Sequence, residues 1–168
     1  KDGIGKFEGG WHGGYDALHV AVKQPFDVAE SNGLTKGAVQ DTVILPYNKI
    51  EPIRKILKRE KLAAIFVEPV MVSGGCIPAT VDFLEELREL CTENNTLLVF
   101  DEIITGFRLA PGGAQQLVKV KPDIIVLGKI LGGGFPIGAI AASREIMEHM
   151  NPLIYQRPNF AFHGGTFT

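Results

Sequence analysis

Short apolar runs alternate along this chain with segments in which apolar residues recur at helical spacing. Uniformly apolar runs are typical of strands buried on both faces of a parallel sheet. Helical patterns between such runs are typical of the crossover connections that parallel strands require. We therefore expect buried strands at residues 42–45, 63–67, 96–100, 124–127 and 137–142.

Amphipathic helices are predicted between and after these strands. Residues 49–59 and 81–94 each place apolar side chains on one face and charges on the other, and Thr80 is the expected N-cap of the second helix. Residues 145–150 form a further short helical pattern. No repeat, low-complexity segment or interdomain linker interrupts the chain, so we expect one α/β unit with a sheet covered by helices.

Ionisable residues follow three of the predicted strands. Glu68 follows Val67, Asp101 and Glu102 follow Phe100, and Lys129 comes shortly after Leu127. The carboxyl ends of parallel strands meet at one rim of the sheet, where open α/β folds bind their ligands. The sequence therefore predicts a site at this rim.

Lys129 is the only charged residue from Ile124 to Ala142. A lysine near the centre of a bilayer costs about 2.5–3.5 kcal/mol, and Gly residues and Pro136 also interrupt the run, so we reject a transmembrane helix. An ordinary interpretation is that the Lys129 stem lies along apolar surface and its ammonium reaches water. The apolar flanks favour burial instead, which makes a neutral amine available as a nucleophile or base, as in Schiff-base chemistry.

Composition narrows the class of protein. The 168 residues are 45% hydrophobic and 21% charged, with a net charge of −2 and no long run of either sign. Nothing in this balance indicates a nucleic-acid or membrane partner. Cys76 and Cys91 lack metal-ligand spacing, so we expect no disulfide framework and no metal site, and a reducing cytoplasmic location is the simpler setting.

A nucleotide-hydrolysing enzyme is an alternative, because an apolar strand ending in Asp101-Glu102 is similar to a magnesium-binding Walker B segment. That interpretation requires GxxxxGK[ST] earlier in the chain. Residues 1–100 contain no such run, and Gly128-Lys129 is followed by Ile130. We keep this alternative open only because residues before Lys1 are not given.

Five stretches together resemble the class III aminotransferases, which depend on pyridoxal phosphate, and within them the glutamate-1-semialdehyde aminomutase group. They occur in family order and span nearly the whole chain: KFEGGWHG at 6–13, VEPVMVSGG at 67–75, LLVFDEIITGFR at 97–108, KPDIIVLGKILGGGFPIGAIAAS at 121–143 and HGGTFT at 163–168. The resemblance implies a fold type I transferase, in which a three-layer, mostly parallel sheet with helices on both faces forms part of the large domain.

The resemblance also implies two catalytic residues. Lys129 would form the Schiff base with the cofactor aldehyde and later act as general base. Asp101 would pair with the pyridine nitrogen, keep it protonated and let the ring accept electrons. Ile103, two residues further, would lie beneath the ring.

Other cofactor-binding residues follow from the same motifs. Trp11 would stack above the ring, with an ordinary core tryptophan as the alternative, and His12 completes the motif without an assigned chemical role. Thr166 would reach the cofactor phosphate of a neighbouring subunit, which implies a homodimer with a shared site. Glu68 and Glu102 are expected near the substrate or behind the primary contacts.

The function implied is an aminotransferase that acts on an amino acid or amino-ketone, with internal amino transfer of the aminomutase type as the alternative. Ser73 and Ile104 stand where many ornithine or terminal-amine transaminases have Glu and Gln, which favours the aminomutase group. The family's phosphate-binding segment matches no residue from Lys1 onward, and its small C-terminal domain would follow Thr168. We therefore expect residues 1–168 to be one partial domain, the central part of the cofactor-binding domain, which leaves open an inactive fragment.

Overall fold

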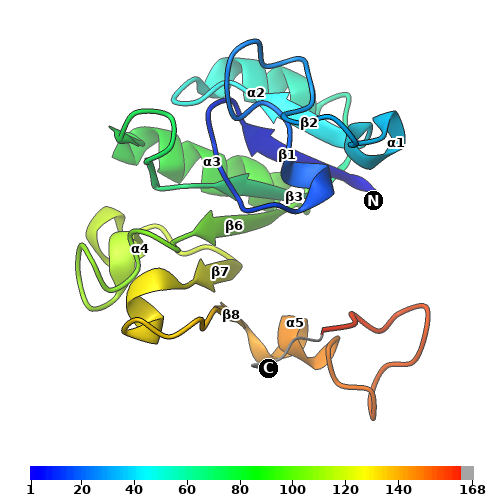
Figure 1. Ribbon diagram of the computed structural model, residues 1–168, viewed down its shortest axis with the longest axis vertical. Helices are drawn as coiled ribbons and strands as arrows, with labels where there is room; N and C mark the ends of the chain where they lie inside the picture. The colour runs from blue at the N-terminus through cyan, green and yellow to red at the C-terminus, as the bar shows by residue number, and fades with distance from the viewer. Residues whose placement is uncertain (164–168) are drawn as a thin grey trace.

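A computed structural model describes residues 1–163. Six strands form one sheet in the order β2-β1-β3-β6-β7-β8 (Figure 1). All neighbouring pairs are parallel except β7 and β8, which run antiparallel. The predicted α/β class with a mostly parallel sheet is confirmed. The strands are β1 (Gly3–Phe7), β2 (Thr42–Leu45), β3 (Leu62–Val67), β6 (Leu97–Asp101), β7 (Ile124–Leu127) and β8 (Ala139–Ala142).

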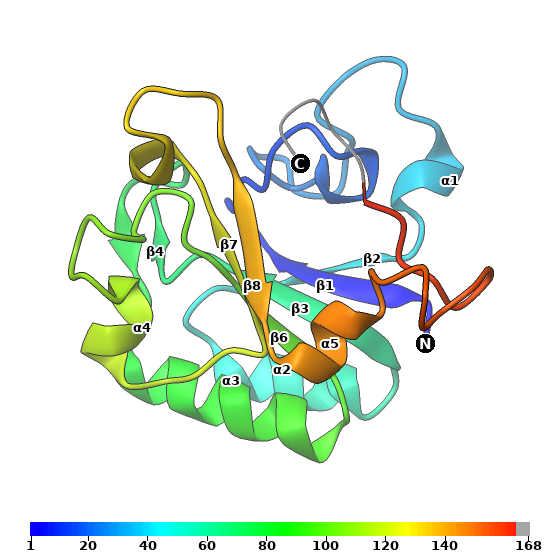
Figure 2. The ribbon, with the colours of Figure 1, turned by 90° about the horizontal axis from the view of Figure 1, so that it is seen from below.

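Helices α2 (Ile50–Leu57) and α3 (Val81–Glu93) pack on one face of the sheet, where the hydrophobic core lies (Figure 2). Their buried residues Ile53, Leu84 and Leu87 join Ile65 of β3 and Phe100 of β6 in one cluster. Thr80 accepts a hydrogen bond from the Phe83 N–H at 3.3 Å, so the predicted cap of α3 is present. Core formation by these two helices therefore follows the sequence pattern closely.

The opposite face of the sheet carries the polar residues of interest. Side chains alternate along a strand, so Phe66 and Asp101 lie on the face away from Ile65 and Phe100. The chain after β1 crosses this face and forms the short 3₁₀ helix η1 (Asp16–Leu18) (Figure 2). A loop with one helical turn, and not a long helix, is therefore the cover above the middle of the sheet.

Strand β1 was missed because its sequence, GIGKF, alternates glycine with other residues and contains Lys6. It nevertheless lies between β2 and β3 and pairs with both. Gly5 leaves space that Leu45, Leu62 and Ile65 occupy, since a Cβ there would lie 3.0 Å from each of these side chains. Packing across the sheet thus selects a glycine where strand propensity would favour a larger residue.

The prediction of a buried strand at 137–142 is wrong in two respects. The observed strand, β8, is antiparallel to β7 and three of its four residues are exposed. As the last strand in the sheet order it has a neighbour on one side only. An apolar run such as AIAA can occur in an edge strand or in a buried strand, so its composition does not predict whether the strand lies at the edge of the sheet.

Several short elements have no clear periodicity and were not predicted. They are α1 (Lys36–Val39), the antiparallel pair β4 (Val70–Met71) and β5 (Ile77–Pro78), α4 (Gly113–Val118) and the 3₁₀ helix η2 (Lys129–Gly132). The helix expected at 145–150 is α5 (Arg144–Glu148). Among the described residues no helix is both long and apolar enough to cross a membrane.

Candidate active site

The end of β6 and the end of β7 bring the predicted catalytic pair to one rim. Asp101 is the last residue of β6 and pairs with Val126 of β7. Lys129 comes three positions after Val126 and begins η2. Because the two strands are parallel neighbours, both side chains start from the carboxyl edge of the sheet.

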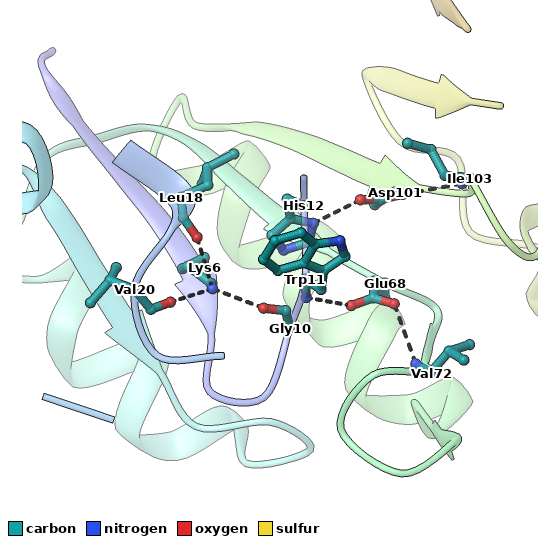
Figure 3. A network of polar contacts seen from close by, with 10 residues as sticks. All are labelled: Lys6, Gly10, Trp11, His12, Leu18, Val20, Glu68, Val72, Asp101 and Ile103. Atoms are coloured by element: carbon teal, nitrogen blue, oxygen red, sulfur yellow. Dashed lines mark hydrogen bonds and ion pairs between the residues drawn. The ribbon is translucent and has the colours of Figure 1, made fainter. Parts of the chain in front are cut away.

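The Asp101 carboxylate is almost completely buried and has two hydrogen-bond partners (Figure 3). Its Oδ2 lies 2.8 Å from Nδ1 of His12, and its Oδ1 accepts the Ile103 N–H at 3.1 Å. Only 8% of the Asp101 side chain and 3% of the His12 side chain are exposed. A buried carboxylate needs such hydrogen-bond partners. His12, which had no assigned role in the sequence analysis, is one of them.

The other ring nitrogen of His12, Nε2, is buried and has no hydrogen-bond partner among residues 1–163. The imidazole is wedged beside Phe66, with ring centroids 5.8 Å apart. When Nδ1 donates to Asp101, the neutral imidazole has a free acceptor at Nε2. No spacing rule connects residue 12 with residue 101, so the sequence could not predict the bond between His12 and Asp101. Only the motif WHG marked His12 as a residue of interest.

Lys129 is exposed, so the expectation of a buried lysine is wrong for the structure described here. Lys129 follows the carboxyl end of β7, and further along the chain a Cβ added at Gly133 or Gly134 would meet no atom within 4 Å. Its backbone is left-handed, with φ at 46°, a conformation that costs energy for any residue except glycine. Ile103 lies against Gly128, since a Cβ there would be 3.5 Å from the Ile103 Cγ2.

Glu68 follows β3 and is buried, with 6% of its surface exposed. Its Oε1 accepts the Trp11 N–H at 2.8 Å, and its Oε2 accepts the Val72 N–H at 3.3 Å. Burial raises the pKa of Glu68, and the bonded N–H groups and His12 oppose that rise. Both carboxylate oxygens therefore bind the backbone beside the site.

Glu102 points to a different place from Asp101. Its carboxylate accepts hydrogen bonds from the Thr105 hydroxyl at 2.9 Å and from the amides of Ala114 and Gln115 in the first turn of α4. The side chain is 1% exposed. These contacts are those of a carboxylate at a helix N-terminus.

Trp11 is 39% exposed and makes an edge-to-face contact with His19, with centroids 5.3 Å apart. Figure 3 shows its indole in front of His12, on the side of the sheet that carries Asp101. Thr166 and the phosphate contact predicted for it lie outside the described residues. In the described part of the chain no group of three His, Cys, Asp or Glu side chains could hold a metal ion.

Lys6 is a buried ionisable residue that sequence reasoning missed. It is 0% exposed and its ammonium donates to the carbonyls of Gly10, Leu18 and Val20 at 2.8, 3.1 and 2.5 Å (Figure 3). Burial lowers the pKa of Lys6 to about 8, against the opposing effect of Glu30 and Glu68. The local sequence offers little sign of this burial, since Asp2 and Glu8 lie close to Lys6 and glycines alternate around it.

A model of the family described as aminotransferase class-III matches residues 1–168. The chain belongs to the class III aminotransferases. Relatives within this family include the glutamate-1-semialdehyde 2,1-aminomutase of Flavobacterium psychrophilum, 45% identical over 93% of this chain and 38% of the relative. The aminomutase of Methanothermobacter thermautotrophicus is 45% identical over 95% of this chain and 39% of its own length. The chain thus spans about two fifths of these relatives.

Solved structures of transaminases and of an aminomutase have the same fold as this chain. An omega-transaminase from Sphaerobacter thermophilus superposes with a TM-score of 0.90 at 34% identity, over 99% of this chain and 40% of that one. A glutamate-1-semialdehyde aminomutase from Pseudomonas aeruginosa gives a TM-score of 0.79 at 26% identity, over 100% and 38%. A transaminase with PLP bound gives 0.84 at 31% identity, over 99% and 39%.

Proposed function

We propose that this chain carries the catalytic lysine and the ring-binding carboxylate of a pyridoxal-phosphate-dependent aminotransferase. One observation carries the proposal: Asp101 is held by His12 and the Ile103 amide at the end of β6, while Lys129 starts from the end of the adjoining β7. The match to the family over residues 1–168 supports it.

The residues present fit the cofactor. Asp101 would pair with the pyridine nitrogen, Ile103 and Trp11 would face the ring, and Lys129 would hold the aldehyde carbon. The orphaned Nε2 of buried His12 provides a further polar atom beside Asp101. When bound, pyridoxal phosphate supplies an aldehyde that condenses with amines and a ring that accepts electrons.

Each residue has a task that follows from its contacts. The Nδ1–H of His12 and the Ile103 amide fix both Asp101 oxygens, and each oxygen keeps a lone pair for a further donor. The exposed Nζ of Lys129 can reach substrate and move a proton at its α-carbon. Ile103 lies against Gly128 and would offer its apolar side chain to one face of the ring.

Glu68 and Glu102 have different surroundings. We propose that Glu68 acts behind the site, because it holds the Trp11 amide. Glu102 was predicted near the substrate or behind the primary contacts, and its bonds to Thr105 and α4 support the second of these positions.

We further propose that the chain corresponds to the central part of the cofactor-binding domain of the longer relatives, in a cytoplasmic enzyme. Its partners would be a small amino donor and acceptor, and a second copy of the chain that shares the cofactor through Thr166. The coverage of about two fifths of each relative supports the partial-domain proposal. An isolated piece of this kind can retain the site residues and still lack activity.

Internal amino transfer is the second candidate function. The relatives reported above are glutamate-1-semialdehyde 2,1-aminomutases, and Ser73 and Ile104 are the residues that favoured this group. A substrate labelled with nitrogen-15 separates the two functions. An aminomutase keeps the label in an isomer of the substrate and needs no separate acceptor, whereas an aminotransferase transfers it to an added acceptor.

The binding test adds pyridoxal phosphate to the purified chain, reduces it with borohydride and maps the modified lysine by mass spectrometry. We expect modification at Lys129 that saturates with cofactor and disappears in Lys129→Ala. Lys61→Ala, at an exposed lysine before β3, is the matched control and should label as wild type does. Label spread over surface lysines would contradict the proposal. Amino transfer itself should be assayed in the longest natural form of the protein.

A further inference from the structure

The peptide group between Gly10 and Trp11 is held from both sides by buried charged side chains. Its carbonyl accepts a hydrogen bond from the Lys6 ammonium at 2.8 Å, and its N–H donates to Glu68 Oε1 at 2.8 Å (Figure 3). Lys6 comes from β1 and Glu68 from the end of β3, which are neighbours in the sheet. The sheet thus grips one peptide of the loop above it.

Lys6 also ties down the far end of the same loop. Its other two hydrogen bonds go to the carbonyls of Leu18 and Val20, on either side of His19. An ammonium has three N–H donors, so every donor of Lys6 is used on backbone carbonyls. A single buried side chain therefore closes the segment from Gly10 to Val20 into a loop pinned to the sheet.

The pinned segment presents two residues to the candidate site. Trp11 directly follows the gripped peptide, and its indole is more than one third exposed, so packing alone does not fix it. His12 is next, and its Nδ1 reaches Asp101 at 2.8 Å. Small backbone shifts at Gly10 would move the imidazole and the indole together.

We propose that Lys6 and Glu68 are positioning residues, which clamp the Gly10–Trp11 peptide and thereby fix Trp11 and His12 above the sheet face that carries Asp101. The clamp itself follows from the contacts of this chain. Its consequence for cofactor binding rests on the proposed function.

A filler side chain would not serve in the place of Lys6. Methionine has a similar volume and could occupy the space, but it offers no donor to three carbonyls that are shielded from water. Only a long side chain with three donors satisfies them at once. Burying the Lys6 amine costs free energy, and the three hydrogen bonds to the loop carbonyls offset that cost.

Trp11 is the only tryptophan, so its fluorescence reports the clamp without a label and without cofactor. The experiment compares wild type with Lys6→Met and Glu68→Met, and with Lys61→Met as the matched control at an exposed lysine. Circular dichroism establishes that each variant is folded. Acrylamide quenching and hydrogen exchange of peptides from 9–20 are then measured.

We expect both clamp variants to fold, with quenching of Trp11 about twofold steeper and exchange in 9–20 about tenfold faster than in wild type. Lys61→Met should match wild type. A folded Lys6→Met with wild-type quenching and exchange would overturn the clamp. Should Lys6→Met fail to fold, Glu68→Met decides by the same two measurements, and wild-type values there would overturn it equally.

Cofactor binding is measured separately on the same proteins. We expect Lys6→Met to weaken the binding of pyridoxal phosphate about tenfold while borohydride still traps it at Lys129. A loosened loop with wild-type affinity would overturn the positioning role. A wild-type chain that binds no cofactor would refute the proposed function, and the fluorescence result would still test the clamp.

Discussion

Lys129 has an exposed side chain and a left-handed backbone conformation. Substitutions that both remove the amine can measure the effect of the backbone strain alone. With φ at 46°, any side chain beyond glycine is strained. We expect Lys129→Gly to be more stable than Lys129→Ala by about 0.5–1 kcal/mol, because only glycine adopts this conformation without a Cβ clash. Urea unfolding of both variants measures the difference. Equal stabilities would show that the backbone relaxes when the lysine is removed.

Asp101 is the residue on which cofactor binding should depend most. Asp101→Asn keeps the size of the side chain but replaces a charged acceptor with a neutral amide. Hydrogen bonds to charged groups contribute about 1.5–3 kcal/mol, so pyridoxal phosphate should bind about 10–100-fold more weakly. Titration of cofactor absorbance checks this. Asp27→Asn, at an exposed aspartate, is the control, and a similar loss there would refute a specific role for Asp101.

Lys6 should make stability depend on pH in a defined window. Its pKa is lowered from 10.5 to about 8 by burial, so between these values the unfolded chain holds a proton that the folded chain has released. The free energy of unfolding is therefore expected to rise with pH across this window and to be flat with respect to Lys6 below it. The rise is at most about 3 kcal/mol, because the neutral amine has two N–H donors and leaves one of its three carbonyls without a partner. Urea unfolding of wild type and Lys6→Met along this pH range measures the effect. Parallel curves for the two proteins would contradict it.

At the scale of elements, Glu102 distinguishes a substrate contact from a structural one. Its carboxylate binds Thr105 and the first turn of α4. We expect Glu102→Gln to lower the free energy of unfolding by about 1–3 kcal/mol, since a buried amide N–H loses an acceptor. Thermal unfolding and substrate binding are measured together. Unchanged stability with altered substrate binding would instead support the substrate-side prediction.

The same scale shows where periodicity succeeds. Strands β2, β3, β6 and β7 and helices α2, α3 and α5 lie where the pattern predicted them, within a few residues. Helices α2 and α3 bury a continuous apolar face, which is what the pattern measures, whereas α5 follows its pattern with no fully buried residue. Periodicity gave the wrong burial for two strands, for opposite reasons. Strand β1 (GIGKF) is largely buried despite its lysine, and β8 (AIAA) is exposed despite its apolar residues.

At the scale of the whole molecule, large apolar side chains remain exposed around β8 and the loop before it. Phe135 is 74% exposed, and Ile137 and Ile140 are 45% and 46% exposed. Contiguous exposed apolar residues mark interaction surfaces. We expect the chain to self-associate in a concentration-dependent manner, and Phe135→Ser to weaken that association. Sedimentation velocity checks both, and a wild-type chain that stays monomeric at high concentration would contradict the proposed homodimer.

The sequence by itself determined the α/β class, most of the sheet and the rim on which Asp101 and Lys129 lie, because apolar runs and the residues that end them are local properties. Tertiary structure alone decided the contacts of those residues. The bond between His12 and Asp101, the grip of Lys6 and Glu68 on one peptide, and the exposure of Lys129 all depend on which strands become neighbours. Residues that are in contact across a sheet can be far apart in the chain, so no local sequence pattern predicts their contact.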